Sequence, residues 1–148
     1  MKLNDEGYLL ITGFEGLSLK PYLDSVKIPT IGYGNTYYND GKRVTLLDNP
    51  ITQEQAFELF KTIADRFALR VSGLVKTDIN QNQLNALTSL AYNIGTANFQ
   101  SSTLLKKVNI NPNDITIAFE FKKWNKAGGK VLNGLTKRRL KESNLYFK

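Results

Sequence analysis

Residues 15–35 read EGLSLKPYLDSVKIPTIGYGN, and within this stretch the pattern changes from helical to strand-like. Glu15 closes an apolar helical pattern, whereas Asp24 lies among turn formers and Thr30 precedes a Gly-x-Gly sequence. Eight residues separate Glu15 from Asp24, and five separate Asp24 from Thr30. The stretch therefore holds two carboxylates in different local environments, with a hydroxyl close behind the second.

The residues on either side of this stretch predict a helix followed by a small sheet. Apolar spacing indicates a helix over residues 3–15, with Asn4 or Asp5 as N-cap and Gly16 as its end. Glu15 would then lie in the last turn, where the helix dipole disfavours a negative charge and suits a proton donor. Prolines, glycines and β-forming residues over residues 17–45 predict two or three antiparallel strands.

The rest of the chain has a helical pattern. Thr52 and Gln55 form a capping-box signature that opens a helix ending at about Ser72. Polar residues 80–83 precede a broadly apolar helix that ends at Gly95, and residues 127–130 indicate a loop. Three more helices are expected: one from Ser101 or Ser102 to Val108, one over 111–124 and one over 134–147.

We therefore expect one α+β domain, mainly α, over residues 1–148. The expected parts are a sheet lobe at about 17–48, a helical lobe at 1–16 and 73–148, and a connecting helix at about 52–72, with a cleft between the lobes.

Composition excludes several chemistries. Hydrophobic residues make up 41% and charged residues 22% of the chain, as in ordinary soluble domains. The chain has no cysteine and no histidine, which rules out a disulfide, a thiol nucleophile, a Ser-His-Asp triad and a histidine zinc site. Glu, Asp, Lys and Tyr remain as acid–base groups.

Charge is distributed unevenly along the chain. Residues 122–148 carry nine Lys/Arg and one acid, whereas residues 1–121 carry eleven Lys/Arg and twelve acids. The basic end is either a solvated face or a surface that attracts a polyanion such as nucleic acid, a membrane or an anionic cell wall. No nucleic-acid fingerprint stands out, so charge alone does not argue for nucleic acid. No signal-peptide or membrane-span pattern stands out either.

Paired carboxylates suit hydrolysis of a glycosidic bond. One carboxylic acid protonates the leaving oxygen, and a carboxylate attacks the sugar or activates a water. Glu15 fits the acid, Asp24 fits the group that stays ionised, and Thr30 can help to hold a water. From spacing alone, these residues also read as a surface acid at a helix end, a turn former and a strand residue.

Several motifs, in order along the chain, resemble the phage-type lysozymes, the endolysins of glycoside hydrolase family 24. The first are Glu15-Gly16, Tyr22-Leu23-Asp24 and Pro29–Gly34; Tyr92-Asn93-Ile94-Gly95 and Ser102–Leu105 follow. Trp124, Ala127–Leu132, Gly134-Leu135 and Arg138-Arg139 resemble the carboxy-terminal region of the lambdoid branch.

The resemblance implies roles for individual residues. Glu15 would be the general acid, and Asp24 and Thr30 would position and activate the attacking water. Looser matches imply substrate contacts at Thr36, Tyr92 and Ser102, and Arg138 or Arg139 as a partner of Glu15. One departure is visible: the family often has histidine where this chain has Asn35, which puts local contacts at the sheet edge in doubt.

The resemblance further implies a lysozyme-like fold and hydrolysis of the β-1,4 bond between N-acetylmuramic acid and N-acetylglucosamine in peptidoglycan, with inversion and without a cofactor or metal. Inversion requires carboxyl groups roughly 6.5–9.5 Å apart. We expect a monomer without nucleic-acid or stable membrane association, held in the host cytoplasm until a holin releases it to the periplasm and wall. Alternatives are a lytic transglycosylase, a non-catalytic wall-binding protein and a basic nucleic-acid binder.

Overall fold

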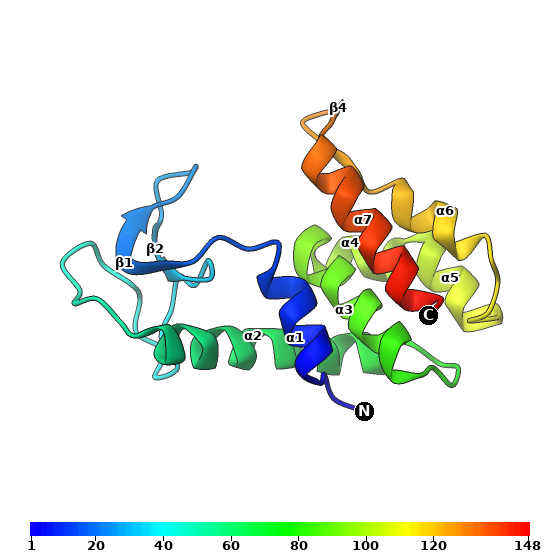
Figure 1. The fold of residues 1–148 in the computed structure, drawn as a ribbon, viewed down its shortest axis with the longest axis horizontal. Coiled ribbons are helices and arrows are strands. Elements are labelled where there is room, and N and C mark those ends of the chain that lie inside the picture. Colours follow the sequence, from blue (N-terminus) through cyan, green and yellow to red (C-terminus); the bar gives the residue numbers. More distant parts are fainter. The chain divides into compact units, whose positions relative to one another are not determined.

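The computed structural model describes residues 1–148, the whole chain. Its elements, drawn in Figure 1, run α1 (Asp5–Thr12), β1 (Ser18–Leu23), β2 (Pro29–Gly32), α2 (Gln53–Leu74), α3 (Gln81–Ile94), α4 (Thr96–Ser101), α5 (Thr103–Ile110), α6 (Ile117–Lys122), β3 (Lys126–Ala127), β4 (Lys130–Val131) and α7 (Asn133–Tyr146). The predicted α+β class, mainly α, is confirmed. None of the helices combines the length and apolar character that a membrane span needs.

The chain divides into two compact units. The first unit holds residues 1–11 and 65–148, and the second unit holds residues 12–64. The α2 helix therefore contributes residues to both units. The lobe boundaries expected from the sequence stay a prediction.

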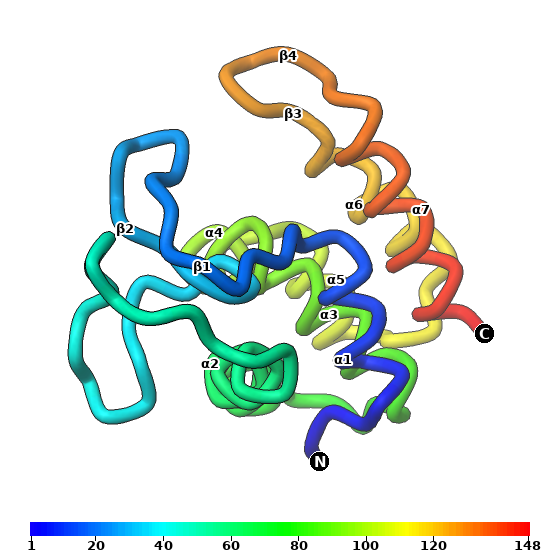
Figure 2. The backbone as a smooth tube through the Cα atoms, turned by 60° about the vertical axis from the view of Figure 1, so that its left-hand side comes forward, coloured from blue at the N-terminus to red at the C-terminus, as the bar shows by residue number.

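The first unit is organised around α3. This helix packs most extensively against α7, and the two lie side by side in both Figure 1 and Figure 2. Leu84, Leu87 and Leu90 are completely buried, as the broad apolar face predicted. Burying one such side chain stabilises the fold by about 1.5–3 kcal/mol. The surrounding core comes from α2, α4, α5, α6 and α7, and its members include Val71, Phe99, Leu104, Ile117, Phe121 and Tyr146.

Capping residues fix where α2 and α3 begin. The Asn80 side chain accepts from the Gln83 N–H at 2.8 Å, and the Gln83 side chain accepts from the Asn80 N–H at 2.9 Å. Thr52 and Gln55 make the same reciprocal pair, at 3.1 and 2.8 Å. Both capping boxes satisfy amide donors that a helix start leaves unpaired, and both predicted starts are confirmed.

The second unit contains the antiparallel sheet β1–β2. Tyr22 pairs with Thr30 and Leu23 with Pro29, and the register shifts between Ser18 and Tyr22. A small core of Ile31, Val44 and Leu59 packs beneath it. A two-stranded sheet is marginal alone, so this packing, in which α2 takes part through Leu59, stabilises the sheet.

The predicted first helix was too long. Residues 3–15 were expected to be helical, but α1 ends at Thr12 and residues 13–15 form a turn. Gly13 explains the early end because glycine destabilises a helix interior. The Asn4 side chain does cap the helix, since its Oδ1 accepts from the Gly7 N–H at 3.1 Å.

Three predictions in the carboxy-terminal half need correction. The α4 helix was missed, so seven helices replace the six expected. The helix expected over 111–124 is only α6, because Asn111 closes α5 and its side chain forms a turn with the Asn113 N–H. Residues 126–131 form a hairpin, not a loop, whose Gly128 and Gly129 both have positive φ. The Gly-Gly pair was a hairpin signal in the sequence.

Candidate functional site

Asp24 opens the hairpin turn between β1 and β2. Its backbone N–H donates to the Ile28 carbonyl at 3.0 Å, and its carbonyl accepts from the Lys27 N–H at 2.9 Å. Lys27 has a φ of 62°, so the turn is a three-residue type whose last position is left-handed. The side-chain Oδ1 of Asp24 accepts from the amides of Val26 and Ile28, both at 2.9 Å. The carboxylate is therefore held by the backbone of its own turn.

Thr30 is brought to Asp24 through the backbone of Ile28. The Thr30 hydroxyl donates to the Ile28 carbonyl at 2.8 Å, while the Ile28 N–H donates to Asp24. Thr30 is buried at 3% exposure, and Asp24 is half-buried. Because the hydroxyl proton is used within the protein, the remaining lone pairs of Thr30 act as acceptors. The free oxygen of Asp24 is also an acceptor, so this pair can take both protons of a water molecule.

Glu15 belongs to the same unit as Asp24 and Thr30. It is half-buried and lies in the turn after α1, where its N–H donates to the Thr12 carbonyl at 3.2 Å. The expectation that Glu15 lies inside the last helical turn is therefore wrong. Its place just beyond the helix end still puts it near the negative end of the helix dipole.

The predicted substrate-contact residues differ in their surroundings. Thr36 is half-buried in the second unit, and its carbonyl accepts from the Val44 N–H. Tyr92 is half-buried on α3, with its ring 5.2 Å from that of Phe67. Ser102 is buried and caps α5: its hydroxyl donates to the Phe99 carbonyl and accepts from the Leu105 N–H. Ser102 thus has a structural role, and substrate contact by all three stays a prediction.

Arg138 and Arg139 are joined by a buried carboxylate. The Nε of Arg138 lies 3.1 Å from Oε1 of Glu142, and the Nε of Arg139 lies 2.8 Å from Oε2. Arg138 also donates to the Ser89 carbonyl, and the Ser89 hydroxyl donates to Glu142 at 2.6 Å. Burial lowers the pKa of Arg139, and the negative charge of Glu142 opposes that effect. Pairing of either arginine with Glu15 stays a prediction.

Asn35, where the family often has histidine, is an internal structural residue. It is 2% exposed, exchanges two backbone hydrogen bonds with Ile31 at 2.9 Å, and donates from its side chain to the Leu59 carbonyl at 3.3 Å. Its Oδ1 has no partner in the protein. Asn35 therefore fastens the end of β2 to α2 and supplies no proton-transfer group.

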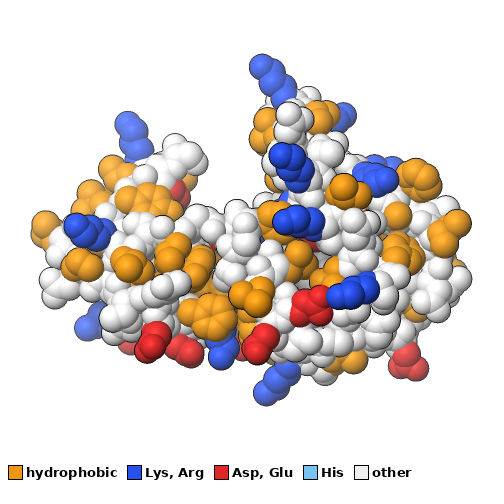
Figure 3. Space-filling model, viewed as in Figure 1, with side chains coloured by type: hydrophobic (Ala, Val, Ile, Leu, Met, Phe, Trp, Pro, Cys, Tyr) orange, Lys and Arg blue, Asp and Glu red, His pale blue; other side chains and the backbone are white.

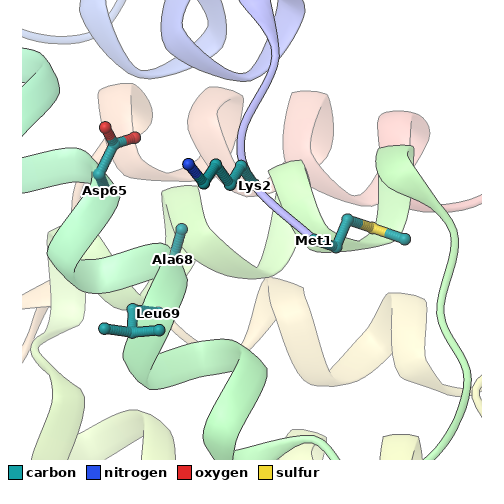
Figure 4. Close-up of a pocket in the computed structure, with 5 residues that line it drawn as sticks. All are labelled: Met1, Lys2, Asp65, Ala68 and Leu69. Carbon is teal, nitrogen blue, oxygen red and sulfur yellow. The ribbon is translucent and has the colours of Figure 1, made fainter.

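A cavity of about 240 Å³ in the first unit is not a candidate for the chemistry. Figure 4 shows its lining side chains, which are Met1, Lys2, Asp65, Ala68 and Leu69. The Asp65 carboxylate accepts from the Tyr8 hydroxyl at 2.5 Å, which ties α1 to α2. The cavity contains none of the residues predicted to act in catalysis.

Sequence reasoning missed two parts of these arrangements. The peptide unit of Ile28, which joins Asp24 to Thr30, carries no side-chain signal that a sequence could show. Glu142 did leave a signal, because it is the one acid among nine cations in residues 122–148. A lone acid three and four residues from two arginines on a helix indicates an ion-pair cluster.

Comparisons with known proteins show the family of this chain. A model of the family described as phage lysozyme matches residues 12–142. The endolysin of Bacillus phage B103 is 42% identical over 149 residues, covering 99% of this chain and 54% of that protein. The endolysin of Salmonella phage P22 is 39% identical over 147 residues, covering 99% of both. The structure of an endolysin from Escherichia coli O157:H7 phage FAHEc1 matches with a TM-score of 0.90 at 38% identity, covering 100% of this chain and 94% of that one.

The helical core and the small antiparallel sheet, together with the match to solved phage endolysins, define a protein of lysozyme-like fold. The chain belongs to the phage lysozyme family. It spans about half the length of the Bacillus phage endolysins that it matches, and nearly the full length of the endolysin of phage P22.

Proposed function

We propose that this chain hydrolyses the β-1,4 bond between N-acetylmuramic acid and N-acetylglucosamine in bacterial peptidoglycan. The observation that carries the proposal is the backbone of Ile28, which holds the Asp24 carboxylate and the Thr30 hydroxyl from its two ends. Membership of the phage lysozyme family supports peptidoglycan as the substrate.

Asp24 and Thr30 together orient the attacking water. The water donates one proton to the free carboxylate oxygen of Asp24 and the other to the hydroxyl oxygen of Thr30. Its remaining lone pair is then available for the anomeric carbon, and Asp24 takes the proton as the bond forms. Holding the water before reaction removes part of the entropic cost of bringing reactants together. Attack by water on the face opposite the leaving group inverts the anomeric configuration.

Glu15 supplies the proton that the leaving sugar oxygen requires. Without protonation that oxygen would depart as an alkoxide, so a positioned carboxylic acid accelerates the step by typically 10²–10⁴-fold. No resident cofactor or metal enters this proposal. Thr36, Tyr92 and Ser102 are proposed to contact the glycan, and Arg138 or Arg139 to pair with Glu15.

The test is a turbidity assay on purified peptidoglycan with the wild type, Glu15→Gln and Asp24→Asn. Each substitution keeps the size of the side chain and removes its acid–base function. We expect each variant to lose at least about a hundredfold in rate while it keeps the melting temperature of the wild type. Undiminished lysis by Glu15→Gln would refute the assignment of the acid.

We also propose, from the family resemblance, that the protein acts as a monomer and reaches the wall from the host cytoplasm through a holin. Expression alone should then leave cells intact, and chloroform should trigger lysis at once. Spontaneous lysis without a holin or permeabilisation would contradict this route.

A further inference from the structure

A second cavity in the first unit lies between the start of α5 and the end of α6. Its volume is about 270 Å³, and it is lined by Thr103, Leu104, Glu120, Lys123 and Trp124. None of these five residues belongs to the proposed catalytic residues or to the predicted substrate contacts. Thr103 directly follows Ser102, one of the predicted substrate contacts, but it opens α5 and does not cap it.

The charged wall of this cavity pairs the buried Glu120 with the exposed Lys123. Glu120 is 3% exposed, and its Oε1 accepts from the Lys123 ammonium at 2.6 Å and lies 3.4 Å from that of Lys107. The hydrogen bond from Lys123 lowers the pKa of Glu120, so the carboxylate is ionised at neutral pH. Because one oxygen serves both lysines, the other remains a strong acceptor for a hydroxyl group. This wall therefore offers an acceptor to a ligand that carries hydroxyl groups.

The remaining wall combines flat apolar surface with hydrogen-bond donors. Leu104 is buried, and the half-buried Trp124 lines the cavity with it. Neither the indole N–H of Trp124 nor the Thr103 hydroxyl belongs to the hydrogen-bond network within the protein. Ligand sites are typically concave and mostly apolar, with a few polar groups that fix orientation. An aromatic face, a carboxylate and two donors in one small cavity match the two sides of a sugar ring.

We propose that this cavity binds a single N-acetylhexosamine unit of the glycan strand. The inference rests on the proposed function, because that function makes an N-acetylated glycan the substrate. The acetamido methyl group packs against Leu104, the acetamido carbonyl accepts from a cavity donor, and a ring hydroxyl donates to Glu120. The cavity thereby selects N-acetylated sugars over plain hexoses.

The chain contains one tryptophan among seven tyrosines, so fluorescence excited selectively at tryptophan comes from Trp124 alone. The experiment titrates Glu15→Gln protein, which cannot hydrolyse the ligand, with the tetramer of N-acetylglucosamine. We expect a saturable shift of the tryptophan emission, and no shift with the unacetylated glucose tetramer. A shift produced by a free peptidoglycan stem peptide and not by the sugar would overturn the proposal.

Two substitutions locate the binding within the cavity. Thr103→Val removes a hydroxyl at constant size, and Glu120→Gln removes the charge of the acceptor. Each substitution should lower the affinity for the sugar by roughly threefold to tenfold. Thr62→Val, on α2 in the second unit, is the matched control and should leave the affinity unchanged. Unchanged affinity in Thr103→Val and Glu120→Gln would overturn the proposal.

The proposed cavity and the proposed function can fail separately. If the wild type lyses peptidoglycan but the sugar produces no shift, the cavity is wrong and the hydrolase stands. If the sugar shifts the emission but the wild type does not lyse, the cavity stands as a sugar site and the hydrolase is wrong.

Discussion

At the scale of single residues, the Thr30 hydroxyl has a clearly defined hydrogen bond in the structure. Its proton goes to the Ile28 carbonyl at 2.8 Å, so toward a water it can act only as an acceptor. Thr30→Ser keeps a hydroxyl that can donate to the Ile28 carbonyl. Thr30→Val keeps the shape of the side chain and removes the hydroxyl.

We therefore expect Thr30→Val to lower kcat by about tenfold to a hundredfold and Thr30→Ser to keep most of the activity. Initial rates on soluble glycan strands measure the difference, and melting temperatures of both variants control for folding. Equal activity in Thr30→Val and wild type would show that the hydroxyl does not hold the water.

Lys27, at the tip of the same hairpin, has a strained backbone. A substitution that relieves this strain should stabilise the protein. Its φ of 62° lies in the left-handed region, where a side chain costs about 1 kcal/mol and glycine does not. Lys27→Gly should raise the free energy of unfolding by a few tenths of a kcal/mol or more, because the greater freedom of the unfolded chain offsets part of the gain. Denaturant titration measures the change; a loss of stability would contradict this view of the turn.

At the scale of elements, α7 is held by an internal charge cluster. Glu142 is completely buried and forms ion pairs with both Arg138 and Arg139. It also accepts a hydrogen bond from the Ser89 hydroxyl of α3. Removing one partner from such a cluster leaves buried charge without compensation, which costs about 3–5 kcal/mol.

Glu142→Gln should therefore lower the free energy of unfolding by several kcal/mol, on the order of 3–5. Glu54→Gln, at an exposed position in the first turn of α2, is the matched control and should have almost no effect. Chemical denaturation distinguishes the two, and a small effect at Glu142 would mean that the cluster is dispensable.

The carboxylate of α6 makes stability depend on pH. The pKa of Glu120 is lowered in the folded state from its ordinary value of 4.5 by the hydrogen bond from Lys123. A lowered folded pKa adds stability that is complete above about pH 5 and is lost as pH falls through the folded value. The melting-temperature gap between wild type and Glu120→Gln should therefore narrow below pH 4.5. A gap that stays constant down to pH 2.5 would contradict this linkage.

Local sequence signals predicted the elements whose start is set by neighbouring residues. They failed where the backbone conformation or contacts between distant residues set the arrangement. The capping boxes at Thr52 and Asn80 are complete within four residues, so both helix starts were readable. Glu15 and Asp24 are predicted because their residue types suit the chemistry and because their motifs resemble those of the family. The tie from Asp24 to Thr30 through Ile28 was not readable, because it depends on the backbone conformation of a turn.

At the scale of the whole molecule, the sequence gives the number of charges but not which of them are buried. The nine cations of residues 122–148 include Arg138 and Arg139, which are buried with Glu142. This segment exposes seven lysines and no acid to solvent. Figure 3 draws the lysine and arginine side chains of one face in blue. Lysines in this arrangement attract an anionic polymer without fixing its geometry.

Binding to an anionic cell wall should therefore weaken as salt rises, since the Debye length falls from about 10 Å at 0.1 M to about 3 Å at 1 M. Replacing Lys126, Lys130 and Lys137 with glutamine should reduce sedimentation with whole walls. The same change at the exposed Lys20, Lys42 and Lys76 is the charge-matched control. Equal losses in the two triple variants would mean that only net charge matters.

The mass of the products formed in H₂¹⁸O tests the central claim most directly. A hydrolase that uses water held by Asp24 and Thr30 should leave muropeptides with one ¹⁸O at each new reducing end. The wild type should give that product and Asp24→Asn should give very little of it. Anhydro-muramyl ends, one water lighter and free of ¹⁸O, would contradict the account and indicate a lytic transglycosylase.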